Sequence, residues 1–298
     1  MKGIIALIAI VALGFGAYYF THTSPQTSAT TGTTASTTQQ AGSQATTTEV
    51  KTETVIGTSV QGRPITAYHY GTGDKEVVFI GDIHGGYTWN TALLGYKTVE
   101  YFKNNPTAIP KNVKVTVIPV LNPDGLNKVV GTTTANFSQA DVASGQAAQI
   151  AGRFNGNTVD LNRNFDCLWQ AKATWQGRTV SGGTGAFSEP ESQAIKSYIE
   201  TQKPIAVVAW YASAGGVYTS SCGSATSPET LALTNLYAKA AGYTSNTTYT
   251  ADPLPGDMTN WLAKIGIPAI SVMLKTHTDM EWGANQAGID AVLARYAK

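Results

Sequence analysis

A dense polar stretch runs from Arg153 to Phe165. It holds two arginines, one acid and four asparagines within thirteen residues. Asn162 and Arg163 offer an amide beside a planar guanidinium fork, which suits a carboxylate held by parallel hydrogen bonds, and Arg153 adds a second fork. Arginine and aspartate are rarely fully buried unless paired, so the stretch is expected at the rim of a polar cleft. The alternative is a polar loop held together by its own hydrogen bonds.

The elements that must position this stretch alternate between strand and helix. Apolar runs predict strands at 75–80, 113–120, 205–211 and 268–274, after a hairpin formed by 53–60 and 64–70. Helical spacing predicts helices at 88–104, 228–241, 257–265 and 285–297, and a capping box at Ser188-Glu-Pro-Glu opens another that ends near 202. This alternation predicts an α/β fold, with a mixed, mostly parallel twisted sheet and helices on both faces.

Four residues fall at or near the carboxyl ends of these predicted strands: His84, Asn122, Ala212 and Met273. Ligands of open α/β sheets bind beyond the carboxyl ends of the strands. The sequence therefore predicts a cleft at this edge of the sheet.

Three further motifs accompany the polar stretch. His84-Gly-Gly and Asn122-Pro-Asp-Gly precede it, and Phe187-Ser-Glu-Pro-Glu follows it. In this order they resemble the zinc carboxypeptidase family, in the bacterial branch that processes murein peptides, from about Thr52 to the C-terminus. The resemblance implies a carboxypeptidase fold and a zinc ion held by His, Glu and a second His. It also implies a glutamate that takes the proton of the zinc-bound water, and a guanidinium-lined pocket for the C-terminal carboxylate of a peptide.

The resemblance assigns roles to residues that this chain keeps. His84 matches the first zinc-ligating histidine, and Asp160 matches the acid that orients this histidine. Arg153, Asn162 and Arg163 match the set that binds the carboxylate of the substrate.

Other positions of the family's site hold residues that cannot do the same chemistry. The glutamate ligand is expected at Tyr87 or Thr88, and neither is a carboxylate. The second histidine belongs in Tyr-His-Ser, where this chain has Ala212, and the general base belongs in Val-Glu-Leu, where it has Met273. Since catalytic zinc sites take three protein ligands, no cofactor is expected here; zinc is expected only if other residues complete the site.

Several further residues are candidates for the same site. Tyr249 could fill the role of the family's mobile tyrosine, with Tyr243 as a rival. Trp169 and Trp175 are about equally suited to line the cleft and to pack in a core. Residues that could rescue a metal site, or that are ordinary loop residues, are Asp82, Asp124, His277, Asp279 and Glu281.

The N-terminus predicts a membrane anchor at 1–20. Gly3 to Phe20 is an apolar run of eighteen residues behind Lys2, near the length that spans a bilayer. No further Lys or Arg occurs before Lys51, so the domain is expected outside the cytoplasm, on a single-pass anchor at the cell membrane. A cleaved signal sequence and a secreted domain are the alternative. Residues 21–52, rich in Thr and Ser, are expected to be a disordered linker before a carboxypeptidase-like domain at 53–298.

The two cysteines, Cys167 and Cys222, lie in polar loops expected to flank the cleft. An even pair without metal-ligand spacing, in a domain expected outside the cytoplasm, favours a disulfide between them. Two buried free thiols are the alternative.

Composition and motifs together leave three hypotheses of function. With charged residues at 13% and a net charge of +1, there is no electrostatic basis for binding nucleic acid. The favoured hypothesis is a membrane-tethered, catalytically inactive binder of peptides, including cell-wall peptides, with a free C-terminal carboxylate. The others are an active carboxypeptidase or cell-wall amidase with an unusual metal set, and a surface spacer with an inherited cleft.

Overall fold

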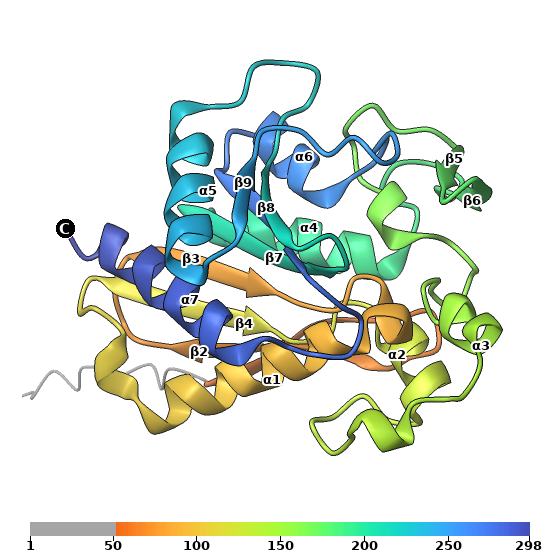
Figure 1. Cartoon of the computed structure of the whole chain (residues 1–298), viewed down its shortest axis with the longest axis horizontal. Helices are drawn as coiled ribbons and strands as arrows, with labels where there is room; N and C mark the ends of the chain where they lie inside the picture. The colour runs from red at the N-terminus through yellow and green to blue at the C-terminus, as the bar shows by residue number, and fades with distance from the viewer. Residues whose placement is uncertain (1–51) are drawn as a thin grey trace, which may run out of the picture. The chain divides into compact units, whose positions relative to one another are not determined.

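The computed structural model of the protein describes residues 52–298 (Figure 1). The predicted anchor at 1–20 and residues 21–51 of the predicted linker lie outside the described residues. Within 52–298, no helix combines the length and the apolar character needed to cross a membrane.

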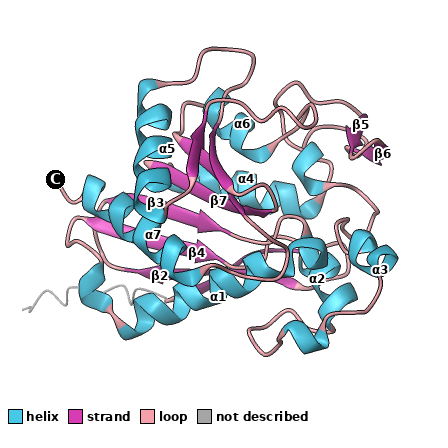
Figure 2. Cartoon of the chain, viewed as in Figure 1, coloured by secondary structure: helices cyan, strands magenta, loops and turns pink. Residues whose placement is uncertain are grey.

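An eight-stranded sheet forms the centre of this part of the chain, in the order β1-β2-β4-β3-β7-β10-β8-β9 (Figure 2). Its strands are β1 (Glu53–Thr58), β2 (Pro64–Tyr70), β3 (Lys75–Ile80), β4 (Val113–Ile118), β7 (Ala206–Ala212), β8 (Gly216–Thr219), β9 (Thr244–Asn246) and β10 (Ala269–Leu274). The pairs β3–β4, β3–β7, β7–β10 and β8–β9 are parallel, and β1–β2, β2–β4 and β8–β10 are antiparallel. The predicted mixed, mostly parallel sheet is confirmed.

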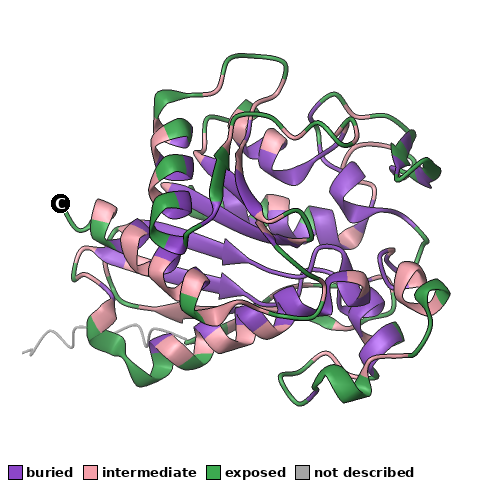
Figure 3. Cartoon of the chain, viewed as in Figure 1, coloured by how far each residue is buried: buried purple, intermediate pink, exposed green. Residues whose placement is uncertain are grey.

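Helices cover both faces of the sheet. One core cluster packs α1 (Trp89–Asn104), α5 (Pro228–Ala241) and α7 (Trp282–Tyr296) onto one face, and a second packs α4 (Pro190–Gln202) and α6 (Met258–Lys264) onto the other. Because successive side chains of a strand point to opposite faces, Val77 of β3 joins the first cluster and Val78 the second. Figure 3 shows the resulting buried sheet between helices whose outer surfaces are exposed.

Smaller elements surround the carboxyl ends of the strands. They are α2 (Pro123–Val130), α3 (Gln146–Ala151), the hairpin of β5 (Lys172–Trp175) and β6 (Arg178–Ser181), and the 3-10 turns η1 (Gly85–Thr88), η3 (Gln139–Asp141) and η4 (Leu161–Arg163). A further 3-10 turn, η2 (Pro106–Ala108), leads from α1 to the start of β4. The hairpin is a separate two-stranded sheet.

Two local predictions from the sequence need correction. The capping box at Ser188 is wrong, because α4 begins at Pro190 and its N-cap is Glu189, with no side-chain cap hydrogen bond. The Ser188 hydroxyl lies one residue too early and donates to the Glu189 carboxylate instead (2.8 Å). No helix is predicted from the sequence at Asn122-Pro-Asp-Gly, but this segment opens α2, and the Asn122 side chain accepts from the backbone N–H of Gly125 (2.9 Å).

The predicted disulfide between Cys167 and Cys222 is confirmed. Their Cα atoms lie 5.7 Å apart, in the usual range for a bridge. The bond joins the loop after η4 to the loop after β8, across a separation of 55 residues. It therefore fixes the end of the polar stretch to the β8 side of the sheet.

Reducing this disulfide should lower the stability of the protein. The loop-entropy account gives about 4 kcal/mol for closing a loop of this length. Thermal unfolding with and without a reductant measures the effect, and the double variant Cys167→Ser/Cys222→Ser serves as the control that a reductant leaves unchanged. An identical transition for the wild-type protein in both conditions would contradict the structural role of the bond.

Candidate functional site

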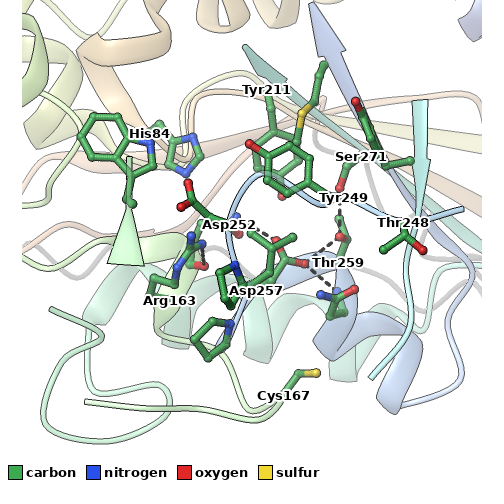
Figure 4. Close-up of a pocket in the computed structure, with 18 of the residues that line it drawn as sticks. His84, Arg163, Cys167, Tyr211, Thr248, Tyr249, Asp252, Asp257, Thr259 and Ser271 are labelled. Carbon is green, nitrogen blue, oxygen red and sulfur yellow. Dashed lines mark hydrogen bonds between the residues drawn. The ribbon is translucent and has the colours of Figure 1, made fainter. Parts of the chain in front are cut away.

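A pocket of about 560 Å³ lies at the carboxyl ends of β3, β7 and β10 (Figure 4). His84 follows β3, Ala212 ends β7 and Met273 lies in β10, directly opposite Tyr211 in the parallel pairing of β7 with β10. His84, Tyr211, Ala212 and Met273 all line the pocket. Other lining residues are Tyr87, Arg153, Asn162, Arg163, Trp175, Tyr249, Asp252, Asp257, Thr259, Ser271 and His277. The cleft predicted at the strand ends is thus present.

A buried ion pair between Arg153 and Asp160 lies behind the pocket. Nε of Arg153 donates to Oδ2 of Asp160 (2.9 Å), and Nη2 forms an ion pair with the same oxygen (2.8 Å). Both residues are buried, and the guanidinium also lies 4.3 Å from the ring centre of Trp175. Burial lowers the pKa of Arg153, and the charge of Asp160 opposes this shift. The structure therefore places Arg153 at the pocket with its charge already matched by a carboxylate.

Asn162 is engaged by α6. Its Nδ2 donates to Oδ2 of Asp257 (2.8 Å), and its Oδ1 accepts from the backbone N–H of Met258 (3.1 Å). Asp257 is the N-cap of α6 and accepts from the backbone N–H of Asn260. The amide thus joins the polar stretch to α6, in addition to lying on the pocket wall.

Arg163 differs from these two residues in having no matched partner. Its side chain is buried, Nη1 donates to the backbone oxygen of Asn162 (3.0 Å), and Nε has no hydrogen-bond partner. No Asp or Glu of residues 52–298 forms an ion pair with it. A buried charge without a partner is costly, so this guanidinium is suited to an anionic ligand.

His84 lies beside this arginine as a buried imidazole. Neither ring nitrogen has a hydrogen-bond partner, and Nε2 is 3.8 Å from Oδ1 of Asp160, too far for a hydrogen bond. Burial lowers the pKa of His84 well below its usual value, and the charges of Arg153 and Arg163 lower it further. This environment therefore favours the neutral form of the imidazole.

The residues around His84 do not fit the zinc site of the family. Ala212 and Met273 line the pocket where a histidine ligand and the general base are expected, and neither side chain can take the role. Thr88 is buried and does not line the pocket, whereas Tyr87 does. Within residues 52–298, no three side chains of His, Cys, Asp or Glu gather closely enough to hold a metal ion.

Three acids considered as replacement metal ligands, Asp124, Asp279 and Glu281, instead accept hydrogen bonds from neighbouring residues. Asp124 accepts hydrogen bonds from Ser59 and Arg63, both at 2.7 Å, and Asp279 accepts from the backbone N–H of Glu281. Glu281 in turn accepts from the backbone N–H of Lys275 (2.6 Å). These contacts hold loops together.

Asp82 and His277 differ from these acids. Asp82 is fully buried, does not line the pocket, and neither carboxyl oxygen has a partner within the described chain. His277 does line the pocket, with its ring centre 4.5 Å from that of Tyr87. Asp82, His84 and His277 therefore do not form a group of three metal ligands.

Of the four candidate aromatic residues, two line the pocket and two do not. Tyr249 lines the pocket, with its ring centre 5.5 Å from that of Tyr218, whereas the hydroxyl of Tyr243 donates to Glu281 (2.6 Å) away from it. Trp175 lines the pocket, and Trp169 instead donates from Nε1 to the backbone oxygen of Gly182 (2.9 Å).

Sequence reasoning missed the polar floor of the pocket. Thr259 donates to Oδ1 of Asp257 (2.8 Å) and lies 3.0 Å from the hydroxyl of Ser271, as Figure 4 shows. The buried hydroxyl of Tyr211 has no partner within 52–298. Only the helix start at Asp257 left a signal in the sequence, because the other residues meet from separate elements.

Comparison with known proteins identifies the family. A sequence model described as zinc carboxypeptidase matches residues 39–292. This chain therefore belongs to the zinc carboxypeptidase family, as its motifs predicted.

Individual relatives are distant. The chain is 24% identical over 211 residues to gamma-D-glutamyl-L-diamino acid endopeptidase 1 of Lysinibacillus sphaericus, covering 64% of this chain and 52% of the relative. It is 29% identical over 168 residues to carboxypeptidase O of Bos taurus, covering 52% of this chain and 42% of the relative. The chain thus spans about half the length, or less, of these curated relatives.

Solved structures share the fold. Murein-tripeptide amidase MpaA from Escherichia coli O157 aligns with a TM-score of 0.58 and 20% identity, covering 82% of this chain and 92% of the amidase. Bovine thrombin-activatable fibrinolysis inhibitor aligns with a TM-score of 0.63 and 16% identity, covering 82% and 90%. These alignments confirm the carboxypeptidase-like fold.

The buried carboxyl of Asp82 should make the free energy of unfolding depend on pH. Burial raises the pKa of its carboxyl well above the usual 3.8, so above pH 3.8 the unfolded chain loses this proton while the folded protein keeps it. The stabilisation that results from this difference is fully present below pH 3.8. Above pH 3.8 the free energy of unfolding falls by up to about 1.4 kcal/mol per pH unit.

Replacing this acid should remove the effect. In chemical denaturation between pH 4 and 8, the free energy of unfolding of Asp82→Asn should rise relative to that of the wild-type protein as pH rises. Asp166→Asn, at an exposed acid paired with Lys264, is the matched control and should track the wild-type curve. A constant difference between Asp82→Asn and wild type at every pH would contradict the assignment.

Proposed function

We propose that this protein binds peptides through their C-terminal carboxylate and does not hydrolyse them. The support is the contrast within one pocket: Arg163 is buried without a matched anion, while Ala212 and Met273 occupy positions where the family's chemistry needs a histidine and a glutamate. A ligand carboxylate would supply the missing partner of Arg163 through parallel hydrogen bonds.

Other groups would assist this guanidinium. Arg153 lines the pocket and adds positive potential, although Asp160 already matches its charge. Asn162 holds the backbone before Arg163 through its contacts with α6, and so acts as a positioning residue. Tyr249 also lines the pocket, and its hydroxyl could add a hydrogen bond to the same ligand. Asp160 fixes Arg153 instead of orienting a metal-bound histidine.

The proposal extends to the surroundings of the protein. The apolar run at 3–20 and the linker at 21–52 are suited to tether the domain at 53–298 to a membrane from outside, or to leave it secreted after cleavage. The disulfide is typical of an oxidising compartment. The ligands would then be extracellular peptides, and the resemblance in fold to a murein-tripeptide amidase makes cell-wall peptides the first class to try.

Calorimetric titration with a short peptide, as the free acid and as the C-terminal amide, tests carboxylate binding. The free acid should bind, and Arg163→Met should weaken it roughly 10- to 100-fold, the usual range for hydrogen bonds to a charged group. Arg178→Met, at an exposed arginine outside the pocket, is the matched control. Equal affinity for the acid and the amide would refute the proposal.

A second candidate is an active metallopeptidase with a non-standard metal set. The observation in its favour is that both ring nitrogens of His84 lack partners and remain available to a metal. His277 and an external ligand would have to complete such a site, because no group of three protein ligands exists within 52–298.

Metal analysis separates the two candidates. The binding proposal predicts far less than one zinc per chain after incubation with zinc and dialysis, and the same low content in His84→Ala. The second candidate predicts about one zinc per chain, its loss in His84→Ala, and release of C-terminal residues from peptides. That result would overturn the inactive assignment.

A further inference from the structure

A loop at 247–256, between β9 and α6, crosses the mouth of the pocket, and we call it the strap. Residues 247–249 and 252–255 of the strap all line the pocket. In Figure 4, Thr248, Tyr249 and Asp252 follow one another from right to left, with Asp252 on the side of His84 and Arg163. The strap therefore forms one side of the proposed binding site.

Both ends of the strap are fixed to the rest of the domain. At one end, the Thr219 hydroxyl donates to the backbone oxygen of Thr247 (2.8 Å). At the other end, the backbone N–H of Gly256 donates to the oxygen of Cys167 (2.7 Å). A Cβ on Gly256 would lie 2.1 Å from the backbone oxygen of Arg163, so only glycine allows this close approach.

The middle of the strap is held by a single hydrogen bond to the β5–β6 hairpin. The backbone N–H of Gln176, at the tip of the hairpin, donates to Oδ2 of Asp252 (3.1 Å). The hairpin itself is firmly placed, because Trp175 is buried against Tyr87 (ring centres 5.0 Å apart) and Arg153. The Gln176 side chain also donates to the Tyr87 hydroxyl (3.3 Å). Asp252 thus connects a strap anchored at its ends to a rigid neighbour.

We propose that Asp252 latches the strap onto the hairpin and so selects ligands by length. This inference rests on the proposed carboxylate binding at Arg163. A peptide held there would run past His84 toward Tyr87 and Trp175, which is the side that the latch closes. The pocket of about 560 Å³ has the size of a small-molecule site. A peptide of two or three residues fits inside, whereas a longer chain needs the latch to open.

The test compares a tripeptide with a decapeptide that ends in the same three residues, both as free acids and as amides. Association rates and affinities are measured for the full-length protein and three variants. Asp252→Ala removes the acceptor, Asp252→Asn keeps an acceptor oxygen without the charge, and Asp166→Ala removes an exposed acid outside the pocket.

The wild-type protein should bind the free-acid tripeptide better than the decapeptide. Asp252→Ala should raise the association rate of the decapeptide about fivefold, as expected for the loss of one solvent-exposed hydrogen bond, and so reduce the preference. Asp252→Asn and Asp166→Ala should keep the wild-type preference. In amide hydrogen exchange, Gln176 should be protected in the wild-type protein and in Asp252→Asn, and unprotected in Asp252→Ala.

The outcomes distinguish the latch from the binding function. Carboxylate-dependent binding with equal rates for both peptides overturns the latch and leaves the binding function standing. An unprotected Gln176 amide in the wild-type protein also overturns the latch, whatever the peptides do. If neither free acid binds better than its amide, the carboxylate function fails, and length selection by Asp252 fails with it.

Discussion

The buried pair of Arg153 and Asp160 is the interaction on which the site depends. Two charges are removed from water at the centre of the polar stretch, and each is tolerated only because the other is there. Removing one partner of such a pair typically costs about 3–5 kcal/mol. The pair also organises its surroundings: Trp175 packs on the guanidinium, and the backbone N–H of Asp160 donates to Ser181 of the hairpin (3.0 Å). The hairpin that closes one side of the pocket is therefore held by the same ion pair.

This pairing sets the polarity of the pocket. One carboxylate oxygen of Asp160 accepts from Arg153, and the other accepts from the backbone N–H of Asn162 (3.1 Å). It stands 3.8 Å from His84, whose pKa is lowered by burial and by the charges of Arg153 and Arg163. Arg163 forms no ion pair with an Asp or Glu of residues 52–298, so it is the charge left for an anionic ligand to meet. The proposed function, in which an anionic ligand replaces the family's metal chemistry, follows from this distribution of charge.

The sheet does not require a histidine at Ala212 or a glutamate at Met273, because backbone hydrogen bonds hold these strands together. Met273 pairs with Tyr211 and Leu274 with Ala212 through the parallel ladder of β10 and β7, which does not depend on the side chain at either position. Methionine and alanine fill their places without a polar group that would need a partner. The strands that form the pocket are therefore kept with Ala212 and Met273 in these positions, and the family remains recognisable from the flanking motifs.

The sequence by itself determined the α/β class and the strands that end at or near His84, Ala212 and Met273, and it favoured the disulfide. Each of these rests on local apolar patterns or on residue identity along the chain. The tertiary structure alone decided that Arg153 is neutralised while Arg163 is not, that Asn162 is taken by Asp257, and that Asp252 reaches Gln176. These contacts join segments between 7 and 95 residues apart, and several competing partners were equally plausible from composition. Spacing along a chain does not encode which of several nearby donors a carboxylate meets, since that depends on how loops from different strands pack over one edge of the sheet.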